Sequence, residues 1–286
     1  MAKIKSEVEQ VIEIQRLERA VAHLYVLGTT PLMMNRMAKK VKEELLLPAR
    51  KLNRAALEQR QKHDPPAEFR DAIYRCRDDN APTLVHIPDN AFKKAMAHAA
   101  LDIPGATKAQ IGRLVNVVDP TTHIYGRPFL SMMPVRLQGR NKAPDIRTRA
   151  IFPRWATMVT VRYVRSIIRE QDVVNLMDAA GLIVGVGDGR AEKGTFNFGS
   201  WELVQKDNPH WKEIVNTGGR KVQVEAMANP VAVDEDSEEL LKWYYAEIIR
   251  RERDRGMTPA KQPSPEAIAA KKGDGNGRRR RPHANN

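Results

Sequence analysis

The sequence predicts an α+β fold in which a four-stranded antiparallel sheet, of the ferredoxin-like or RNA-recognition type, is covered on one side by two helices. The main observation is a strand-helix-strand pattern that occurs twice, at 20–118 and at 156–204. A second observation is that basic segments punctuated by Gly and Pro interrupt this pattern. The 286 residues suffice for one such domain with insertions, which we place at 20–228.

The first half of the pattern begins at 20–28, where AVAHLYVLG alternates in the period of a half-buried strand. A short strand at 83–87 leads into a helix whose start is marked by Pro88 and Asp89. Apolar residues of that helix recur at i, i+3, i+4 and i+7, which predicts one buried face. A strand at 114–118 completes this half.

The second half begins at 156–164, where ATMVTVRYV is β-branched and alternating and therefore predicts a strand. A helix follows at 170–180, with its apolar residues on one face and Gly181 as the expected stop. The apolar run LIVGV at 182–186 predicts a further strand, and 197–204 predicts the last one.

Two basic insertions interrupt the pattern. Residues 36–77 hold twelve Lys or Arg against six Asp or Glu, which predicts a polar helical insertion that we place at 36–80. Residues 127–165 hold nine Lys or Arg against one acid. There we expect a strand at 133–137 followed by a long basic loop at 138–155, since Gly and Pro punctuate the segment.

The two ends of the chain have compositions of their own. Residues 1–19 predict an N-terminal extension, and 229–254 predict a C-terminal helix. Residues 255–286 hold eight Lys or Arg against two acids and little apolar surface, so we expect a disordered basic tail.

The charge of the chain indicates its class of partner. A formal net charge of +13 and a pI near 9.9 favour an anionic partner, above all nucleic acid. The single cysteine, Cys76, excludes a disulfide framework and a cysteine-based zinc site, as expected in a reducing compartment. The chain has no long apolar run and no signal-peptide pattern, so we expect a cytoplasmic protein, in a bacterial cell or a phage-infected host, without a membrane partner.

The glycine-rich stretch at 185–194 departs from the known nucleotide-binding patterns. It lacks the Lys-Ser/Thr ending of a phosphate loop, and no helix is expected after it to hold a pyrophosphate. Glycines between strands instead permit close approach of the backbone to an extended ligand. We expect Gly187, Gly189, Arg190 and Lys193 to contact nucleic acid there; the alternative is a plain glycine hairpin with solvated charges.

The segment LQGRNKAPDIRTRAIFPRW, at 137–155, mixes basic and aromatic residues. Basic groups follow phosphates while aromatic faces stack on bases, so this mixture favours a single strand over a duplex. The alternative is a solvated loop whose two aromatic residues only anchor it to the core. The predicted contacts are Arg140, Lys142, Arg147, Arg149, Phe152, Arg154 and Trp155.

Two further groups of basic residues are candidates for nucleic-acid contact. Arg36, Lys39 and Lys40 have helical spacing just after the first strand, and Lys93 and Lys94 lie off the apolar face of their helix. A solvated helix face explains either group equally well.

The sequence gives little support for catalysis. The histidines show no HExxH spacing, no GxSxG elbow is present, and the lone Cys76 is better explained as a buried or incidental thiol. Asp188 and Glu192 are more simply ion-paired than metal-bound. We expect no catalytic residue, no metal and no cofactor. Core packing is expected for at least one of Phe196 and Phe198, which share one face of their strand.

Two motifs carry a resemblance to a known family. The stretch IPDNAFKKAM at 87–96, followed much later by GVGDGRAEKGTFNFG at 185–199, resembles the repeat-associated mysterious protein (RAMP) superfamily, and in particular its CRISPR effector backbone subunits. The resemblance implies a palm-like sheet, a thumb at 138–155 and head-to-tail stacking of subunits along guide RNA. The stretches TPLMMNR, EFRDAIYR and GDGRAEKG are also similar to uncharacterised bacteriophage proteins.

Three functions remain open at this point. The first is a non-catalytic protein that coats single-stranded nucleic acid, RNA slightly favoured, as a head-to-tail homo-oligomer or filament. The second is a phage single-stranded DNA-binding protein of the annealing type that acts in recombination. The third is a metal-dependent nuclease. Other effector subunits, or phage replication and recombination proteins, are the expected further partners.

Overall fold

The structure is a computed structural model that describes residues 16–46, 63–118, 121–136, 144–194 and 196–254. The chain divides into two compact units, 1–239 and 240–286, and every strand of the described residues belongs to the first unit. The predicted disordered tail and most of the predicted N-terminal extension lie outside the described residues.

The main sheet has four strands, each antiparallel to its neighbours, in the order β4-β8-β1-β9. Along the chain, α1, α3, α4 and α5 lie between β1 and β4, and α6 lies between β8 and β9. The prediction of an α+β fold with an antiparallel sheet is confirmed. The bounds are β1 Arg19–Gly28, α4 Asn90–Ala99, β4 Val115–Val117, β8 Ala156–Val164, α6 Glu170–Ile183 and β9 Trp201–Val204.

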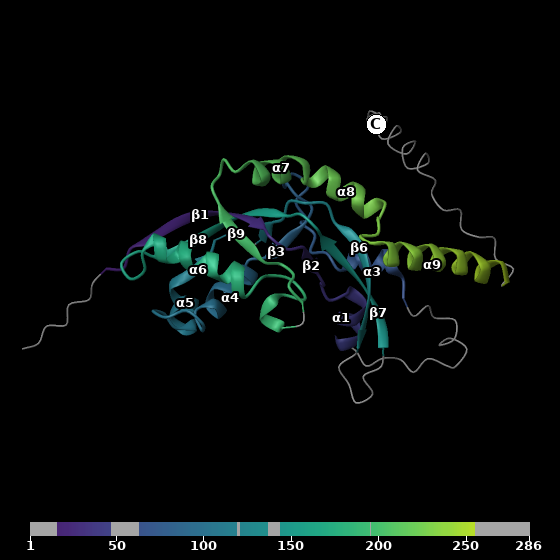
Figure 1. The fold of residues 1–286 in the computed structure, drawn as a ribbon, viewed down its shortest axis with the longest axis horizontal. Coiled ribbons are helices and arrows are strands. Elements are labelled where there is room, and N and C mark those ends of the chain that lie inside the picture. Colours follow the sequence, from purple (N-terminus) through teal and green to yellow (C-terminus); the bar gives the residue numbers. More distant parts are fainter. Residues whose placement is uncertain (1–15, 47–62, 119–120, 137–143, 195, 255–286) are drawn as a thin grey trace, which may run out of the picture. The chain divides into compact units, whose positions relative to one another are not determined.

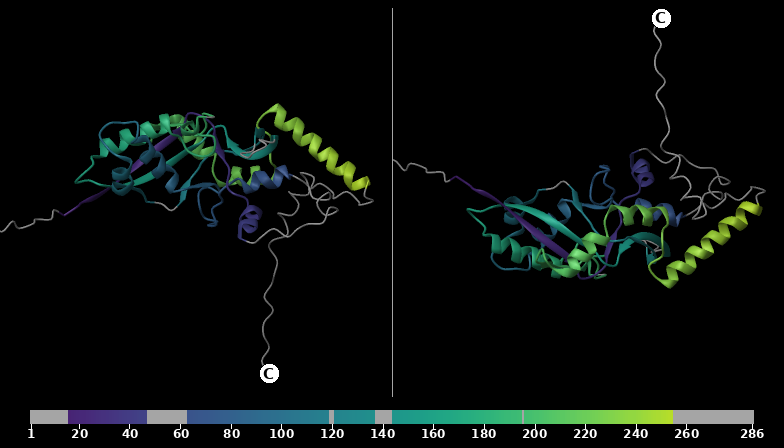
Figure 2. Two further views of the ribbon diagram at one scale, coloured as in Figure 1. Left: turned by 90° about the horizontal axis from the view of Figure 1, so that it is seen from below. Right: turned by 90° about the horizontal axis from the view of Figure 1, so that it is seen from above.

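The alternation in β1 determines which side of the sheet is buried. Ala22, Leu24 and Val26 are buried, while His23 between them is exposed. Successive side chains of a strand point to opposite faces, so these apolar residues form one face of the sheet. Figures 1 and 2 show α4 and α6 side by side along one side of β1 and β8.

Aromatic residues fix helices to both faces of the sheet. Phe92 of α4 is fully buried and meets Trp201 of β9 edge-on, with ring centroids 5.3 Å apart. Tyr25 of β1 meets Trp211 of helix α7 (Pro209–Thr217) edge-on at 5.1 Å. The indole N–H of Trp211 also donates to the carbonyl oxygen of Thr157 over 3.1 Å. Tyr25 is two residues from exposed His23, so both side chains point to the same face of the sheet. Helix α7 therefore covers the face opposite to the one that α4 covers.

Shorter sheets and helices complete the description. The strands β2, β7 and β6 form a three-stranded antiparallel sheet in that order, and β3 pairs with β5. Helix α9 lies within the segment predicted as a C-terminal helix and continues from the first unit into the second. The bounds are β2 Leu32–Met34, α1 Lys39–Leu46, α3 Pro65–Asp71, β3 His86–Pro88, α5 Lys108–Leu114, β5 Thr121–His123, β6 Phe129–Arg136, β7 Pro144–Phe152, α8 Arg220–Ala228 and α9 Glu235–Asp254.

The predicted long basic loop at 138–155 is largely a strand. β7 pairs with β6 from Phe129↔Ile151 to Arg136↔Pro144, so the two form a β-hairpin. Arg147 and Arg149 alternate with Ile146, Thr148 and Ala150, as in a strand, but the proline signals outweighed this period in the prediction. Pro144 in fact begins the strand, and Pro153 follows its end. The tip of the hairpin, 137–143, lies outside the described residues.

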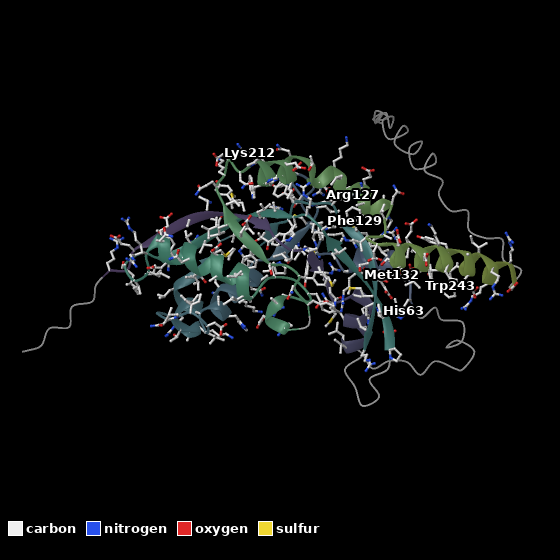
Figure 3. The ribbon with its side chains drawn as sticks, in the orientation of Figure 1. His63, Arg127, Phe129, Met132, Lys212 and Trp243 are labelled. Atoms are coloured by element: carbon white, nitrogen blue, oxygen red, sulfur yellow. The ribbon has the colours of Figure 1, made fainter. Side chains whose placement is uncertain are left out.

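His63 connects this hairpin to α3. Its Nδ1 lies 2.8 Å from a carboxylate oxygen of Glu68 in α3, and its Nε2 lies 3.0 Å from Asp145 in β7 (Figure 3). At the opposite end of the hairpin pairing, the guanidinium of Arg127 lies 5.5 Å from the ring centroid of Phe129, also labelled in Figure 3. The His63 contacts therefore join β7 to α3, whereas the Arg127–Phe129 contact is local to the start of β6.

The strand predicted at 182–186 is not formed, because α6 continues to Ile183. Gly181 lies inside this helix, where a Cβ would come within 2.2 Å of the carbonyl oxygen of Trp201. The glycine therefore serves close helix-strand packing and does not end the helix. The strand predicted at 197–204 is shorter than expected and begins at Trp201.

A buried glutamine joins α8 to two loops. Gln223 has no exposed surface. Its amide oxygen accepts from two backbone N–H groups and its amide nitrogen donates to three carbonyl oxygens, so every polar atom of the side chain is satisfied. The partners are Leu84 and Val85 for the oxygen and Ile124, Gly126 and Gly218 for the nitrogen, at 2.7–3.1 Å.

Candidate nucleic-acid interface

The glycine loop, which we define as residues 185–199, follows the backbone of β2. The amide of Asp188 donates to the carbonyl oxygen of Met33 over 2.9 Å, and the amide of Gly199 donates to that of Pro31 over 2.8 Å. Gly187 has a φ of +84°, and a Cβ at this position would come within 2.4 Å of the Met33 oxygen. A side chain at position 187 would therefore force the loop away from β2.

The glycine loop and the first turns of α4 enclose a groove. It consists of two adjoining cavities of about 210 and 230 Å³ that share Ala91, Gly187 and Arg190. The N-terminus of α4, with its positive end of the helix dipole, faces the second cavity through Asn90. We call this the glycine-loop groove. Its further lining residues include Lys94, His98 and Glu192 in the first cavity and Asn35, Tyr74 and Asp188 in the second.

One cation of the groove comes from the β-hairpin. Arg149 of β7 forms an ion pair with Asp188, with 2.9 Å between Nε and Oδ2. Its Nη1 also donates to Sδ of Met33 in β2 over 3.8 Å, although the two residues are 116 positions apart in the chain. Asn35 donates to the same carboxylate oxygen of Asp188 over 3.1 Å. The Arg149 side chain is only 16% exposed, so it is held in one place beside the groove.

A second cation of the groove belongs to a chain of polar contacts. Arg190 contacts Glu192 at 2.7 Å and donates to the carbonyl oxygen of Gly187 over 3.2 Å. The other carboxylate oxygen of Glu192 lies 2.5 Å from Nδ1 of His98, whose Nε2 lies 2.8 Å from the ammonium of Lys108. Arg190 and Glu192 are therefore fixed relative to α4 and α5.

The pKa of Glu192 reflects this setting. Burial alone raises the pKa of its carboxyl, but the hydrogen bond and charge of Arg190 and the charges of His98 and Lys193 outweigh burial. The pKa therefore lies below its ordinary value, and the carboxylate keeps its negative charge at neutral pH. Two carboxylates, those of Asp188 and Glu192, thus accompany the two arginines of the groove.

The structure separates the two lysines of α4. Lys94 is exposed and lines the groove, whereas Lys93 donates to the side-chain oxygen of Asn116 in β4 over 2.5 Å. Lys193, in the 3-10 turn Ala191–Lys193, is exposed and acts electrostatically on Glu192. Of the predicted sites, Lys94, Gly187 and Arg190 line the groove, while Arg149 and Lys193 act on its lining residues Asp188 and Glu192.

Arg36 lies near the second cavity. Its neighbour Asn35 lines that cavity, and its backbone N–H donates to the carbonyl oxygen of Ala72. Burial lowers the pKa of His86, and the charges of His123 and Arg36 lower it further, against the effect of two backbone hydrogen bonds. Lys39 and Lys40 are the first two residues of α1.

Other predicted contacts lie away from the groove. Arg147 pairs with Asp145 on its own strand at 3.2 Å, and Arg154 forms a two-pronged contact with Glu213 of α7 at 2.9 and 2.6 Å. Arg140 and Lys142 lie outside the described residues. The basic residues of 138–155 that the structure describes therefore do not form one surface. Among them, only Arg149 reaches the glycine-loop groove.

Phe152 and Trp155 do not have the predicted role in base stacking. Both side chains are fully buried, so neither ring offers a face to a base. The indole N–H of Trp155 donates to the carbonyl oxygen of Thr30 over 2.9 Å, and the ring fills the space that a Cβ on Gly28 would need. The anchoring role in the alternative agrees with the structure, although the segment is largely a strand and not a solvated loop.

The structure draws attention to an aromatic pair, Phe196 and Phe198, of which at least one was expected to pack in the core. Phe196 and Phe198 stack on each other with ring centroids 5.5 Å apart and an interplanar angle of 28°. Phe196 is exposed. The signal that could have identified them is their surroundings, because TFNFGS contains no other apolar residue with which a core strand would alternate.

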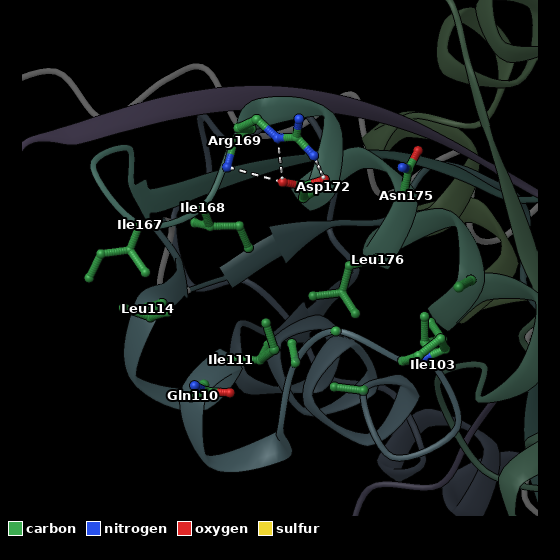
Figure 4. Close-up of a pocket in the computed structure, with 15 residues that line it drawn as sticks. Ile103, Gln110, Ile111, Leu114, Ile167, Ile168, Arg169, Asp172, Asn175 and Leu176 are labelled. Carbon is green, nitrogen blue, oxygen red and sulfur yellow. Dashed lines mark hydrogen bonds and ion pairs between the residues drawn. The ribbon is translucent and has the colours of Figure 1, made fainter.

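An apolar cavity of about 580 Å³ lies apart from these residues, between α5, α6 and the turn that follows β8 (Figure 4). Ile111, Leu114, Ile168 and Leu176 extend toward it, and an Arg169–Asp172 ion pair lies at its rim. Its lining offers few groups to an anion.

Neither a metal cluster nor a membrane-spanning helix occurs in the described part of the chain. No group of three or more His, Cys, Asp or Glu side chains among these residues is arranged to hold a metal ion. No helix among them combines the length and apolar character needed to span a membrane.

The chain matches no family model and no curated protein.

Proposed function

We propose that this protein binds single-stranded nucleic acid in the glycine-loop groove, without catalysing a reaction on it, and that its copies associate head to tail along the ligand. The observation that carries the proposal is a groove lined by Lys94, Arg190 and the N-terminus of α4. Arg149 pairs with its lining residue Asp188, and Lys193 acts electrostatically on its lining residue Glu192. These groups come from three separate parts of the chain. Convergence of cations with a helix N-terminus favours phosphate.

The carboxylates in the groove are consistent with a phosphate ligand. Glu192 accepts a hydrogen bond from Arg190 over 2.7 Å, at a position where a phosphate oxygen would accept one, and Asp188 forms an ion pair with Arg149 at 2.9 Å. They keep the guanidinium groups oriented in the absence of ligand. Polynucleotide phosphates would have to compete with these carboxylates, so the groove favours a multivalent ligand over a single small anion.

The fold supports the same proposal. With the inserted elements left aside, the chain order β1-α4-β4-β8-α6-β9 and the sheet order β4-β8-β1-β9 are those expected of a ferredoxin-like domain, and we propose that assignment. The preference for RNA and the head-to-tail association rest on the resemblance to CRISPR effector backbone subunits. The β6–β7 hairpin would then take the place of the thumb.

The test is the nucleic acid that the purified protein carries and binds. Full-length protein is purified at low salt, and the co-purified nucleic acid is treated with RNase or DNase. Its affinity for single-stranded RNA, single-stranded DNA and duplex of equal length is then measured at two salt concentrations. We expect single strands to bind more tightly, RNA most tightly, with strong salt dependence. Equal affinity for duplex, or cleavage of the oligonucleotide, would contradict the proposal.

Head-to-tail association gives a separate expectation. The mass of the complex, measured by light scattering, should rise stepwise as the oligonucleotide is lengthened. A mass that stays constant for all lengths would exclude coating while leaving binding intact.

Removing a groove carboxylate should strengthen binding. In Glu192→Gln the negative charge beside Arg190 is lost, so a phosphate no longer competes with it. We expect roughly a fivefold lower Kd for a single-stranded oligonucleotide, or about 1 kcal/mol, measured by fluorescence anisotropy. The control is Glu202→Gln, because Glu202 is an exposed residue of β9 that is not among the groove residues. An equal gain in both variants would mean that only net charge matters.

A further inference from the structure

The rings of Phe196 and Phe198 form a unit on the surface of the glycine loop. Their centroids lie 5.5 Å apart, and the rings deviate from parallel by 28°. Phe198 is half-buried, while Phe196 is 37% exposed. Exposed aromatic area is unfavourable in water at about 25 cal/mol per Å², so a ring that is stacked and yet open indicates a surface prepared for a further apolar partner.

Gly189 sets the position of this pair. A Cβ at position 189 would come within 2.9 Å of Phe198 and 3.2 Å of Phe196, and the φ of +62° there is one that side chains rarely adopt. The amide of Phe198 also donates to the carbonyl oxygen of Gly189 over 3.1 Å. The rings therefore lie against bare backbone, and their orientation is fixed before any ligand arrives.

The pair is adjacent to the glycine-loop groove. Gly189 precedes Arg190, which lines both cavities of the groove, and the backbones of Arg190 and Phe198 form a parallel bridge. A nucleic-acid strand whose phosphates lie beside Arg190 would therefore bring its bases to the aromatic pair.

We infer that Phe196 and Phe198 are a stacking platform for an unpaired base, an inference that rests on the proposed function. The exposed ring of Phe196 takes the base, and Phe198 supports Phe196 from behind. All four bases have a π-face, so this contact tolerates any sequence. A base paired within a duplex presents no free face, so the platform also accounts for selection of single strands over duplex.

The experiment compares Phe196→Leu with wild-type protein on two single-stranded oligonucleotides of equal length, one with bases and one made of abasic sites. Leucine keeps an apolar side chain but removes the ring. Stacking on an aromatic side chain is worth about 1–3 kcal/mol per base, so Phe196→Leu should weaken binding of the base-containing strand about tenfold. Binding of the abasic strand should not change, because its phosphates are intact.

Two further measurements make the result specific. Phe196→Trp keeps a stacking face and should bind as tightly as wild-type protein. A strand containing 2-aminopurine should lose fluorescence on binding to wild-type protein and lose much less with Phe196→Leu. Melting temperatures should agree among all three proteins, because the side chain at 196 is exposed.

The outcomes separate this inference from the proposed function. If wild-type protein binds neither strand, both the proposed function and the stacking platform are refuted. If it binds and Phe196→Leu binds the base-containing strand equally well, the platform is refuted while the groove stands. If Phe196→Leu weakens binding of both strands equally, the ring supports the conformation of the glycine loop and does not contact a base. The inference is then also refuted.

Discussion

Replacing Lys94, Arg190 and Lys193 together by glutamine is expected to weaken binding of a single-stranded oligonucleotide about 100-fold at 0.1 M salt. Each phosphate contact on a single strand contributes roughly 0.7 to the slope of log K against log salt concentration. Because 0.1 M and 1 M salt differ by one log unit, each contact raises log K by about 0.7 at 0.1 M relative to 1 M. Three contacts therefore account for about two units of both slope and log K. Titrations at four salt concentrations give both quantities.

The matched control removes the same number of charges elsewhere. Lys206, Lys212 and Lys221 are exposed residues in and around α7 and α8, outside the groove. Glutamine at these three positions lowers the net charge equally, so it should change the affinity much less. If the two triple variants lose affinity to the same extent, the positive charge of the chain acts diffusely, and the groove is not the binding site.

Trp155→Ala should lower the free energy of unfolding by about 4 kcal/mol. The side chain is fully buried, and its removal leaves a large cavity, for which losses of roughly 3–5 kcal/mol are typical. The carbonyl oxygen of Thr30 also loses its hydrogen-bond donor. Urea denaturation followed by circular dichroism gives the change.

The same variant decides between two roles for Trp155. Under conditions where the variant is folded, its affinity for single strands should equal that of wild-type protein, since no ring face is open to a base. Trp243→Ala is the matched control, because Trp243 in α9 is 63% exposed and its removal should leave the unfolding free energy nearly unchanged (Figure 3). A stable Trp155→Ala variant with weak binding would contradict this prediction and show that Trp155 contributes to binding as well as to the core.

The parts of the fold that the sequence predicts are those with strong local periodicity. The alternation at 20–28 and 156–164 and the apolar face of 90–99 correspond to β1, β8 and α4. The errors have a common origin, since they occur where tertiary contacts override local signals. β7 is a strand that pairs with β6, and the glycine at 181 allows close packing against Trp201 and does not end the helix.

The site was predictable in its residue types and less so in its grouping. Lys94, Arg149 and Arg190 were each candidates from composition, but a sequence does not show that Arg149 faces Asp188 across the fold or that Lys93 faces Asn116 instead. Burial was the other missing quantity. It divides the aromatic candidates, since Trp155 lies in the core and Phe196 lies on the surface.

The hydrogen bonds of Gln223 have a consequence for how the protein opens. A single side chain satisfies the amides of Leu84 and Val85 and the carbonyl groups of Ile124 and Gly126. If α8 detaches, all of these groups lose their partner in one step, so the segments should open as one cooperative unit. The amides of Leu84 and Val85 would then exchange with deuterium at rates set by α8, although more than a hundred residues separate them along the chain.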